Sequence, residues 1–212
     1  MIGIMYIIVF MPDGCGTSHM TLTRWYKGGL LNLDRMHLAG VQTYGAESII
    51  TDSAPAATAF ACGVKASDKM LGVLPDKTTV PGVFVSDSET RTKPVASVLE
   101  AARLAGRSTG MVSTSNIQHA SPAGYSAHWP VRSEYNEIAE QQVYGNFDVV
   151  LGGGEQYLLP KSAGGQRTDG ENLVDVLKDR GYSYVRTAAE MNAVHGERLW
   201  GMFAADAMAY EM

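Results

Sequence analysis

Short apolar runs alternate with amphipathic stretches along this chain. The runs at residues 109–114 and 147–151 have the length and the apolar content of strands buried in a parallel sheet, and residues 199–208 are predicted to form a strand and a turn. Segments 95–107 and 172–180 repeat apolar residues at a helical period. This alternation predicts an α/β fold with a mostly parallel central sheet flanked by helices.

The same pattern predicts several shorter elements. A helix is expected after residue 17, and strands are expected over residues 41–44 and 182–186. A helix over residues 188–192 follows a threonine that can cap it. Residues 155–170 are polar and contain glycine, so they are predicted to form a loop.

The N-terminal stretch contains a long apolar run. Residues 4–10 are predicted to form the first buried strand, which runs directly into Pro12, Asp13 and Gly14. No basic segment precedes the run and no small-residue cleavage site follows it, so no signal peptide is expected in this chain. The run is also too short to span a bilayer, so no membrane segment is expected.

Composition limits the class of protein. With 212 residues, of which 45% are hydrophobic and 18% charged, the chain fits a single globular domain over residues 1–212. Its net charge of −5 offers no basic surface for nucleic acid. Cys15 and Cys62 suggest neither a disulfide framework nor a metal pair, and we expect both to be small buried residues.

A stretch of small residues carries the candidate chemistry. The sequence Thr51-Asp52-Ser53 leads into a run of alanines in which Pro55 stands early. Proline fits the first turn of a helix, so Ser53 is expected at a junction between a loop and a helix. The amides and the dipole at such a junction can hold an anion such as phosphate. The plainer alternative is that Asp52 or Ser53 only caps the helix.

A second polar segment follows the strand at residues 109–114. It contains His119 and Ser121 and, further along, Arg132. An extended backbone would point His119 and Ser121 to the same side, because one residue separates them. A guanidinium suits phosphate oxygens because it can bind two of them at once. By itself, the segment also fits an ordinary turn and a surface arginine.

The string from Asp52 to Lys65 resembles the nucleophile signature of the alkaline phosphatases, Asp-Ser-Ala-x-x-x-Thr-Ala followed by Gly-Val-Lys. The resemblance implies an alkaline phosphatase-like fold and a phosphoserine intermediate on Ser53. By the same resemblance, Arg132 matches the arginine that grips the substrate phosphate, and Asp52 is placed to orient it. The implied activity is hydrolysis of small-molecule phosphate monoesters.

The resemblance also implies zinc and magnesium as cofactors. Asp13 matches the aspartate that bridges a zinc and a magnesium ion, and Ser121 matches a hydroxyl ligand of magnesium. His119 matches a neighbouring position that is aspartate in some members and histidine in others. The family usually has Gly-Asp-Gly-Met-Gly where this chain has Pro-Asp-Gly-Cys-Gly, a change that keeps the carboxylate.

The resemblance covers only the first half of the family. Alkaline phosphatases carry their remaining metal ligands downstream of the matched segments, whereas zinc normally needs three or four protein ligands and Asp13 is the one credible candidate here. We therefore expect a single catalytic domain truncated at its C-terminus. The alternative is a catalytically inactive fragment that binds phosphate, another anion or a partner. A periplasmic or extracellular location and a homodimer are further family expectations.

Overall fold

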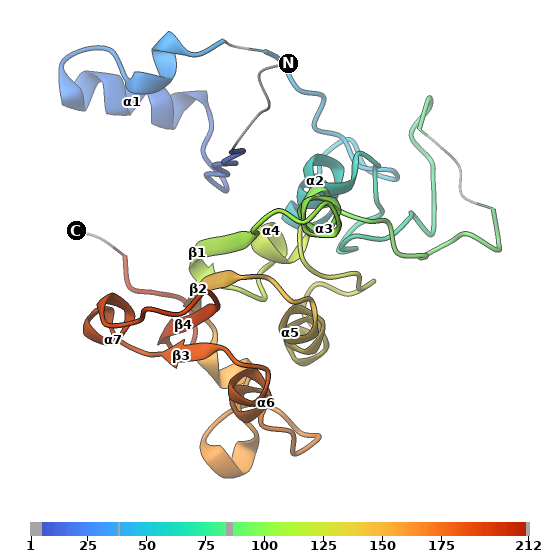
Figure 1. The fold of residues 1–212 in the computed structure, drawn as a ribbon. Coiled ribbons are helices and arrows are strands. Elements are labelled where there is room, and N and C mark those ends of the chain that lie inside the picture. Colours follow the sequence, from blue (N-terminus) through green and yellow to red (C-terminus); the bar gives the residue numbers. More distant parts are fainter. Residues whose placement is uncertain (1–5, 38, 84–86, 211–212) are drawn as a thin grey trace. The chain divides into compact units, whose positions relative to one another are not determined.

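The structure divides into two compact units. The computed structural model describes residues 6–37, 39–83 and 87–210, and its two units span residues 1–42 and 43–212 (Figure 1). The first unit holds Asp13, and the second holds the sheet and Ser53. Within the described part of the chain, every helix is too short or too polar to span a bilayer.

Four parallel strands form the sheet of the second unit. Their order is β1-β2-β4-β3, so β1 and β3 lie at the edges (Figure 1). The strands are β1 (Gly110–Asn116), β2 (Val149–Gly153), β3 (Ser183–Val185) and β4 (Leu199–Ala204). The helices along the connections are α5 (Tyr135–Tyr144), α6 (Leu173–Asp179) and α7 (Ala188–Asn192). The predicted α/β fold, with a parallel sheet flanked by helices, is confirmed.

One face of the sheet carries the largest apolar core. Met111, Val150 and Trp200 are buried at matching positions of three neighbouring strands. Helices α5 and α6 pack their own apolar side chains against this row; these are Ala139, Val143, Leu173, Val174 and Leu177. Full burial of one large apolar side chain stabilises a fold by about 1.5–3 kcal/mol, so this cluster is a main source of stability.

Strand β1 forms an open edge among the described residues. Its one paired neighbour there is β2, and Val112, on the face opposite Met111, is 78% exposed. The strand predicted over residues 4–10 is wrong for residues 6–10, which form no strand and leave Phe10 87% exposed. Residues 4 and 5 lie outside the described residues. The prediction failed because an apolar run indicates a capacity for burial, whereas a strand also needs a hydrogen-bonding partner.

Three smaller expectations are also wrong. Residues 41–44 form no strand and are largely exposed. Cys15 is exposed and Cys62 is half-buried, so neither is the fully buried residue that its type suggests. The loop predicted over residues 155–170 contains two 3-10 helices, which commonly serve as connectors. These are η2 (Glu155–Tyr157) and η3 (Lys161–Ala163).

A second layer of small residues surrounds helix α2 (Ser53–Cys62). The buried side chains of this layer, which come from α2 and from the segments around it, are mostly alanines: Ala54, Leu71, Ala120, Ala123, Ala127 and Ile138. Helix α4 (Ala120–Ala123) packs against α2. A Cβ atom added to Gly124 would lie 2.6 Å from the Cβ of Ala57, so the approach of these two helices needs a residue without a side chain.

The first unit is held by polar contacts. Helix α1 (Thr17–Lys27), at the predicted place, is followed by the 3-10 helix η1 (Asn32–Arg35). The Nε of Arg24 donates to both carboxylate oxygens of Asp34, at 3.1 and 3.0 Å. Hydrogen bonds from Arg24 and from the Leu31 amide lower the pKa of Asp34 to about 2. Neither helix contains a buried residue, so no apolar core forms around these two helices.

Candidate active site

Ser53 is the first residue of helix α2, as its sequence context predicts. Asp52 is the N-cap residue in extended conformation, and its side chain accepts a hydrogen bond from the Ala54 amide at 3.4 Å. Pro55 lies in the first turn, where its missing N–H leaves no backbone partner unsatisfied. Gly63 ends the helix in the left-handed conformation. Ser53 therefore lies at the positive end of a helix dipole.

Arg132 lies beside this helix start through its contact with Asp52. Its Nη1 donates to Oδ1 of Asp52 at 2.6 Å, and the two side chains are 19% and 29% exposed. Its Nη2 lies 3.0 Å from Nε2 of His119. A guanidinium can only donate, so Nε2 of His119 is the acceptor and the imidazole proton lies on Nδ1. The structure thus brings Asp52, His119 and Arg132 together, with Ser53 adjacent in the chain.

The backbone around Arg132 is paired with a segment far away in the sequence. The Arg132 amide donates to the carbonyl of Lys69 at 2.9 Å. Leu71 and Trp129 form an isolated antiparallel bridge, in which each amide donates to the other residue's carbonyl, at 2.9 and 2.8 Å. The backbone of segment 69–73 thus holds the backbone of residues 129–132 in place through hydrogen bonds.

Ser121 does not share an extended backbone with His119. His119 is the N-cap residue of α4, and Ser121 lies inside that short helix, next to Pro122. The extended backbone expected between the two residues is therefore wrong. Pro122 is tolerated here because its missing N–H needs no partner in the first turn of a helix.

Asp13 lies in the first unit of the structure. It lies in a turn in which the Cys15 amide donates to the carbonyl of Pro12 at 3.1 Å, and Gly14 has φ +73°. Asp13 and Gly14 thus form a turn after the apolar run. The side chain is exposed.

One group of three potential metal ligands comes together in the described part of the second unit, and it lies away from the nucleophile. Carboxylate oxygens of Glu140, Asp169 and Glu171 approach within 4.8 Å of one another. They surround the fully buried guanidinium of Arg167, which donates to Asp169 and, at 2.9 Å, to the carbonyl of Asn136. Arg167 already supplies the positive charge that these carboxylates need, so the cluster is structural.

His128, which lies four residues before Arg132 in the chain, forms an ion pair with Glu100 that the sequence analysis did not predict. Nδ1 of His128 lies 2.7 Å from the carbonyl oxygen of Gly72, and its Nε2 lies 2.8 Å from Oε1 of Glu100. Both neighbours are acceptors, so both ring nitrogens carry protons and the imidazole is charged. His128 and Glu100 are 28 residues apart, and no local spacing signals their contact.

The pKa values of this pair shift in opposite directions. Burial alone would lower the pKa of His128, but hydrogen bonds to Glu100 and to the Gly72 carbonyl outweigh it and raise that pKa above 6.5. Burial alone would raise the pKa of Glu100, but hydrogen bonds from His128 and Ser97 outweigh it and lower that pKa below 4.5. Both shifts favour the charged forms of the two side chains.

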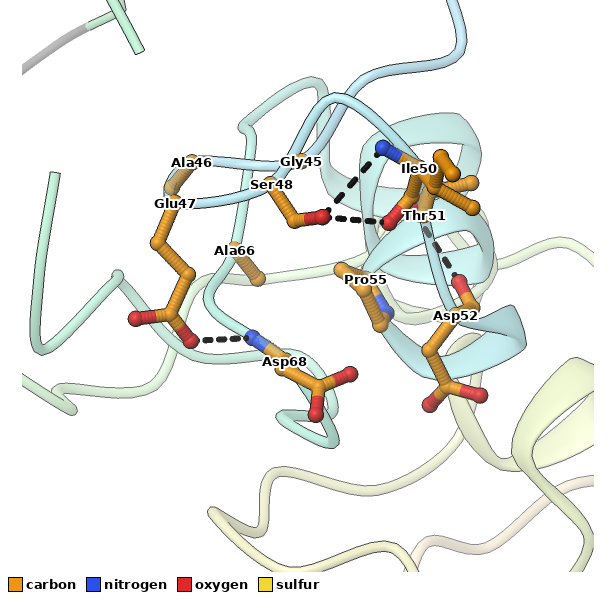
Figure 2. A pocket seen from close by; sticks show the side chains of 10 residues that line it. All are labelled: Gly45, Ala46, Glu47, Ser48, Ile50, Thr51, Asp52, Pro55, Ala66 and Asp68. Carbon is orange, nitrogen blue, oxygen red and sulfur yellow. Dashed lines mark hydrogen bonds between the residues drawn. The ribbon is translucent and has the colours of Figure 1, made fainter. Parts of the chain in front are cut away.

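A small hollow lies beside the start of α2 (Figure 2). Asp52, Pro55 and Asp68 are among the residues that line it. Its volume of about 10 Å³ accommodates one water molecule, which is far too little for a phosphate ester. Phosphate would therefore have to bind at the exposed side of Ser53 and Arg132, outside this hollow.

Comparison with known proteins identifies the family. A family model described as alkaline phosphatase matches residues 4–212. The chain belongs to the alkaline phosphatase family. It is 30% identical to the repressible alkaline phosphatase of Saccharomyces cerevisiae, covering 97% of this chain and 38% of that enzyme. It is 34% identical to alkaline phosphatase 4 of Bacillus subtilis, covering 96% of this chain and 42% of that enzyme.

Solved structures of alkaline phosphatases share the fold. The enzyme from the Antarctic bacterium TAB5 superposes with a TM-score of 0.78 at 30% identity, covering 93% of this chain and 52% of that chain. A variant of the TAB5 enzyme, 29% identical to this chain with the same TM-score of 0.78, has magnesium bound in its M3 site. This chain thus spans about half the length of the alkaline phosphatases it matches.

Proposed function

We propose that this chain supplies the nucleophile and the phosphate grip of a phosphate monoester hydrolase. Ser53 is the nucleophile, Arg132 binds the phosphoryl oxygens, and Asp52 orients Arg132. The observation that carries the proposal is the contact between Arg132 and Asp52, the residue directly before Ser53 at the start of α2. Membership of the alkaline phosphatase family supports the reaction class.

The proposed reaction has two balanced steps. The Ser53 oxygen forms a bond to phosphorus while the ester oxygen leaves as the alcohol, which gives a phosphoserine. Water then attacks the same phosphorus, the bond to Ser53 breaks, and inorganic phosphate is released. Arg132 offers a planar cation to the phosphoryl oxygens, and the dipole of α2 adds positive potential where negative charge develops.

Asp52 and His119 hold the guanidinium of Arg132 from two sides. Asp52 supplies the opposite charge and His119 a neutral acceptor. An arginine fixed in this way loses less side-chain entropy when it binds phosphate than one that moves freely in solvent. We propose that this restraint is the contribution of Asp52 and His119 to substrate binding.

We also propose that the activity depends on zinc and magnesium. By the family resemblance we assign Asp13, Ser121 and His119 to metal binding. The carboxylate of Asp13 and the hydroxyl of Ser121 are each a type of oxygen donor that magnesium prefers. His119 would have to release Arg132 from its Nε2 before that nitrogen could bind a metal. The described residues assemble no set of three ligands beside Ser53, so they do not by themselves fit a catalytic zinc ion. When bound, such metals activate an oxygen nucleophile and stabilise the leaving oxygen.

A second candidate function is binding of phosphate without turnover. One observation favours it: among the described residues, no cluster of three metal ligands forms beside Ser53. The substrates of the hydrolase proposal are small-molecule phosphate monoesters. A periplasmic or extracellular location and a homodimer stay predictions from the family.

Hydrolysis of a chromogenic phosphate monoester at alkaline pH, with zinc and magnesium added, separates the two candidates. We expect turnover that Ser53→Ala abolishes and that Ser162→Ala, the same change at an exposed hydroxyl in η3, leaves unchanged. Turnover that survives Ser53→Ala contradicts the role of Ser53. Phosphate binding without any turnover supports the second candidate.

A further inference from the structure

A buried hydroxyl on the nucleophile helix contacts the segment that supports Arg132. Thr58 lies in α2 and is fully buried. Its Oγ1 accepts a hydrogen bond from the Gly72 amide at 2.9 Å and donates to the carbonyl of Ala54 at 2.9 Å. The carbonyl of Met70 lies 3.3 Å from the same oxygen, as a second acceptor. One side chain therefore bonds both to its own helix and to segment 69–73.

A continuous set of backbone hydrogen bonds leads from this hydroxyl to Arg132. Gly72 follows Leu71, which exchanges hydrogen bonds with Trp129. Two residues before Leu71, the carbonyl of Lys69 accepts from the Arg132 amide. The helix that begins with Ser53 and the backbone that carries Arg132 are thus linked through one short segment.

This segment has little freedom to move on its own. Gly72 has φ +57°, and a Cβ atom there would lie 2.4 Å from the carbonyl oxygen of Ala127. Lys69 also adopts a left-handed backbone, with φ 64°, which non-glycine residues seldom do. The surrounding contacts must stabilise this conformation, and the bond from Thr58 to Gly72 is one of them.

We propose that Thr58 is a positioning residue that sets the distance between Ser53 and Arg132 through segment 69–73. The effect of Thr58 on phosphate binding rests on the proposed function. The mechanical link between Thr58 and the Arg132 backbone rests on the hydrogen bonds alone. A threonine hydroxyl often bonds back to the carbonyl four residues earlier without any wider role. Here the same oxygen also satisfies the buried amide of Gly72, which would otherwise lack its acceptor.

Amide hydrogen exchange measured by NMR on the unliganded chain tests the link from Thr58 through segment 69–73 to the Arg132 backbone. Thr58→Val keeps the shape and removes the hydroxyl, whereas Thr58→Ser keeps the hydroxyl. We expect faster exchange in Thr58→Val at the Gly72 amide and also at the Arg132 amide. Amides within β2 and β4 should keep their wild-type rates, and Thr58→Ser should restore protection at both sites. An unchanged Arg132 amide in Thr58→Val overturns the proposal.

A second measurement needs no variant and covers the case in which Thr58→Val fails to fold. Native-state exchange of the wild-type chain in low denaturant gives an opening free energy for each amide. We expect the amides of Gly72 and Arg132 to open together, at one shared free energy. Opening of Arg132 well before Gly72 overturns the link.

Titration with inorganic phosphate, in the presence of zinc and magnesium, then separates this inference from the proposed function. We expect weaker phosphate binding in Thr58→Val and wild-type binding in Thr58→Ser. If Arg132→Gln binds phosphate as well as wild type, the proposed function fails while the exchange result stands. If Arg132→Gln weakens binding and Thr58→Val does not, the positioning role of Thr58 fails while the proposed function stands.

Discussion

The sheet and the layer around Ser53 are packed in different ways. Large apolar side chains fill the sheet core, where Phe147 and Trp200 are almost completely buried. The layer around α2 is filled mainly by alanines and is crossed by hydrogen bonds in which the side chains of Thr58, His128 and Arg132 take part. The first arrangement gains stability from the area buried, and the second fixes positions through directional contacts.

This difference separates the effects expected of mutations. A large side chain removed from the sheet core loses burial and leaves a cavity, so it costs stability of the whole unit. A hydrogen bond contributes only about 0.5–1.5 kcal/mol net, but its loss frees a specific segment. Changes around α2 should therefore affect phosphate binding more than they affect unfolding.

The largest expected effect is on the sheet core. Trp200→Ala should lower the free energy of unfolding by about 3–5 kcal/mol, because it removes a fully buried indole. Trp25→Ala is the matched control, since that side chain is 76% exposed and should cost about 0.5 kcal/mol or less. Urea unfolding followed by circular dichroism measures both. An equal loss of unfolding free energy in the two variants would contradict the claim that the sheet core is the main source of stability.

Packing between α2 and α4 should tolerate no added methyl group. Gly124→Ala should cost about 1–3 kcal/mol, because its new Cβ would lie 2.6 Å from the Cβ of Ala57. Gly29→Ala is the control, as no heavy atom lies within 4 Å of its added Cβ. Phosphate titration should also show weaker binding in Gly124→Ala. A stable Gly124→Ala variant with unchanged phosphate binding would contradict the close approach of the two helices.

The smallest effect should be a pH dependence from His128 and Glu100. The raised pKa of His128 gives stability that is full below its unfolded value of 6.5 and is lost as pH rises through the folded pKa. The lowered pKa of Glu100 gives stability that is present above 4.5 and is lost as pH falls through the folded pKa. The pair therefore contributes most between these two values, by about 1–2 kcal/mol.

The difference in unfolding free energy between wild type and His128→Gln measures this contribution. Cys62 interacts with Glu100, and Tyr125 interacts with Cys62, but burial raises both pKa values, that of Cys62 to about 11, so they stay neutral in this range. The difference should shrink as pH rises above 6.5 and again as it falls below 4.5. A difference that stays constant from pH 4 to pH 9 would contradict a charged pair.

Local sequence signals predicted where helices α2 and α7 begin, and with α2 the position of Ser53. Asp52 and Pro55 mark the start of α2 in the sequence, so the placement of Ser53 followed from capping and proline geometry. Thr187 likewise caps α7, at the predicted helix. The contact between Arg132 and Asp52 joins residues 80 positions apart, and it was expected only through the family resemblance.

Long-range contacts explain what the sequence did not reveal. Residues 6–10 read as a strand by composition, yet they have no strand partner among the described residues. The bonds of Thr58 to Gly72 and of His128 to Glu100 depend on how distant segments fold together. Ser121 lies inside the short helix α4, so no spacing rule for an extended chain applies there.

Titration of inorganic phosphate into the chain, with zinc and magnesium present, tests most directly that Ser53 and Arg132 form one phosphate site. Wild type should bind, and Arg132→Gln should bind about tenfold more weakly or worse, since it loses a charge-assisted hydrogen bond. Arg107→Gln, which removes the same charge from an exposed position, should match wild type. Equal phosphate affinity in Arg132→Gln and wild type, or no binding by wild type, would contradict the account.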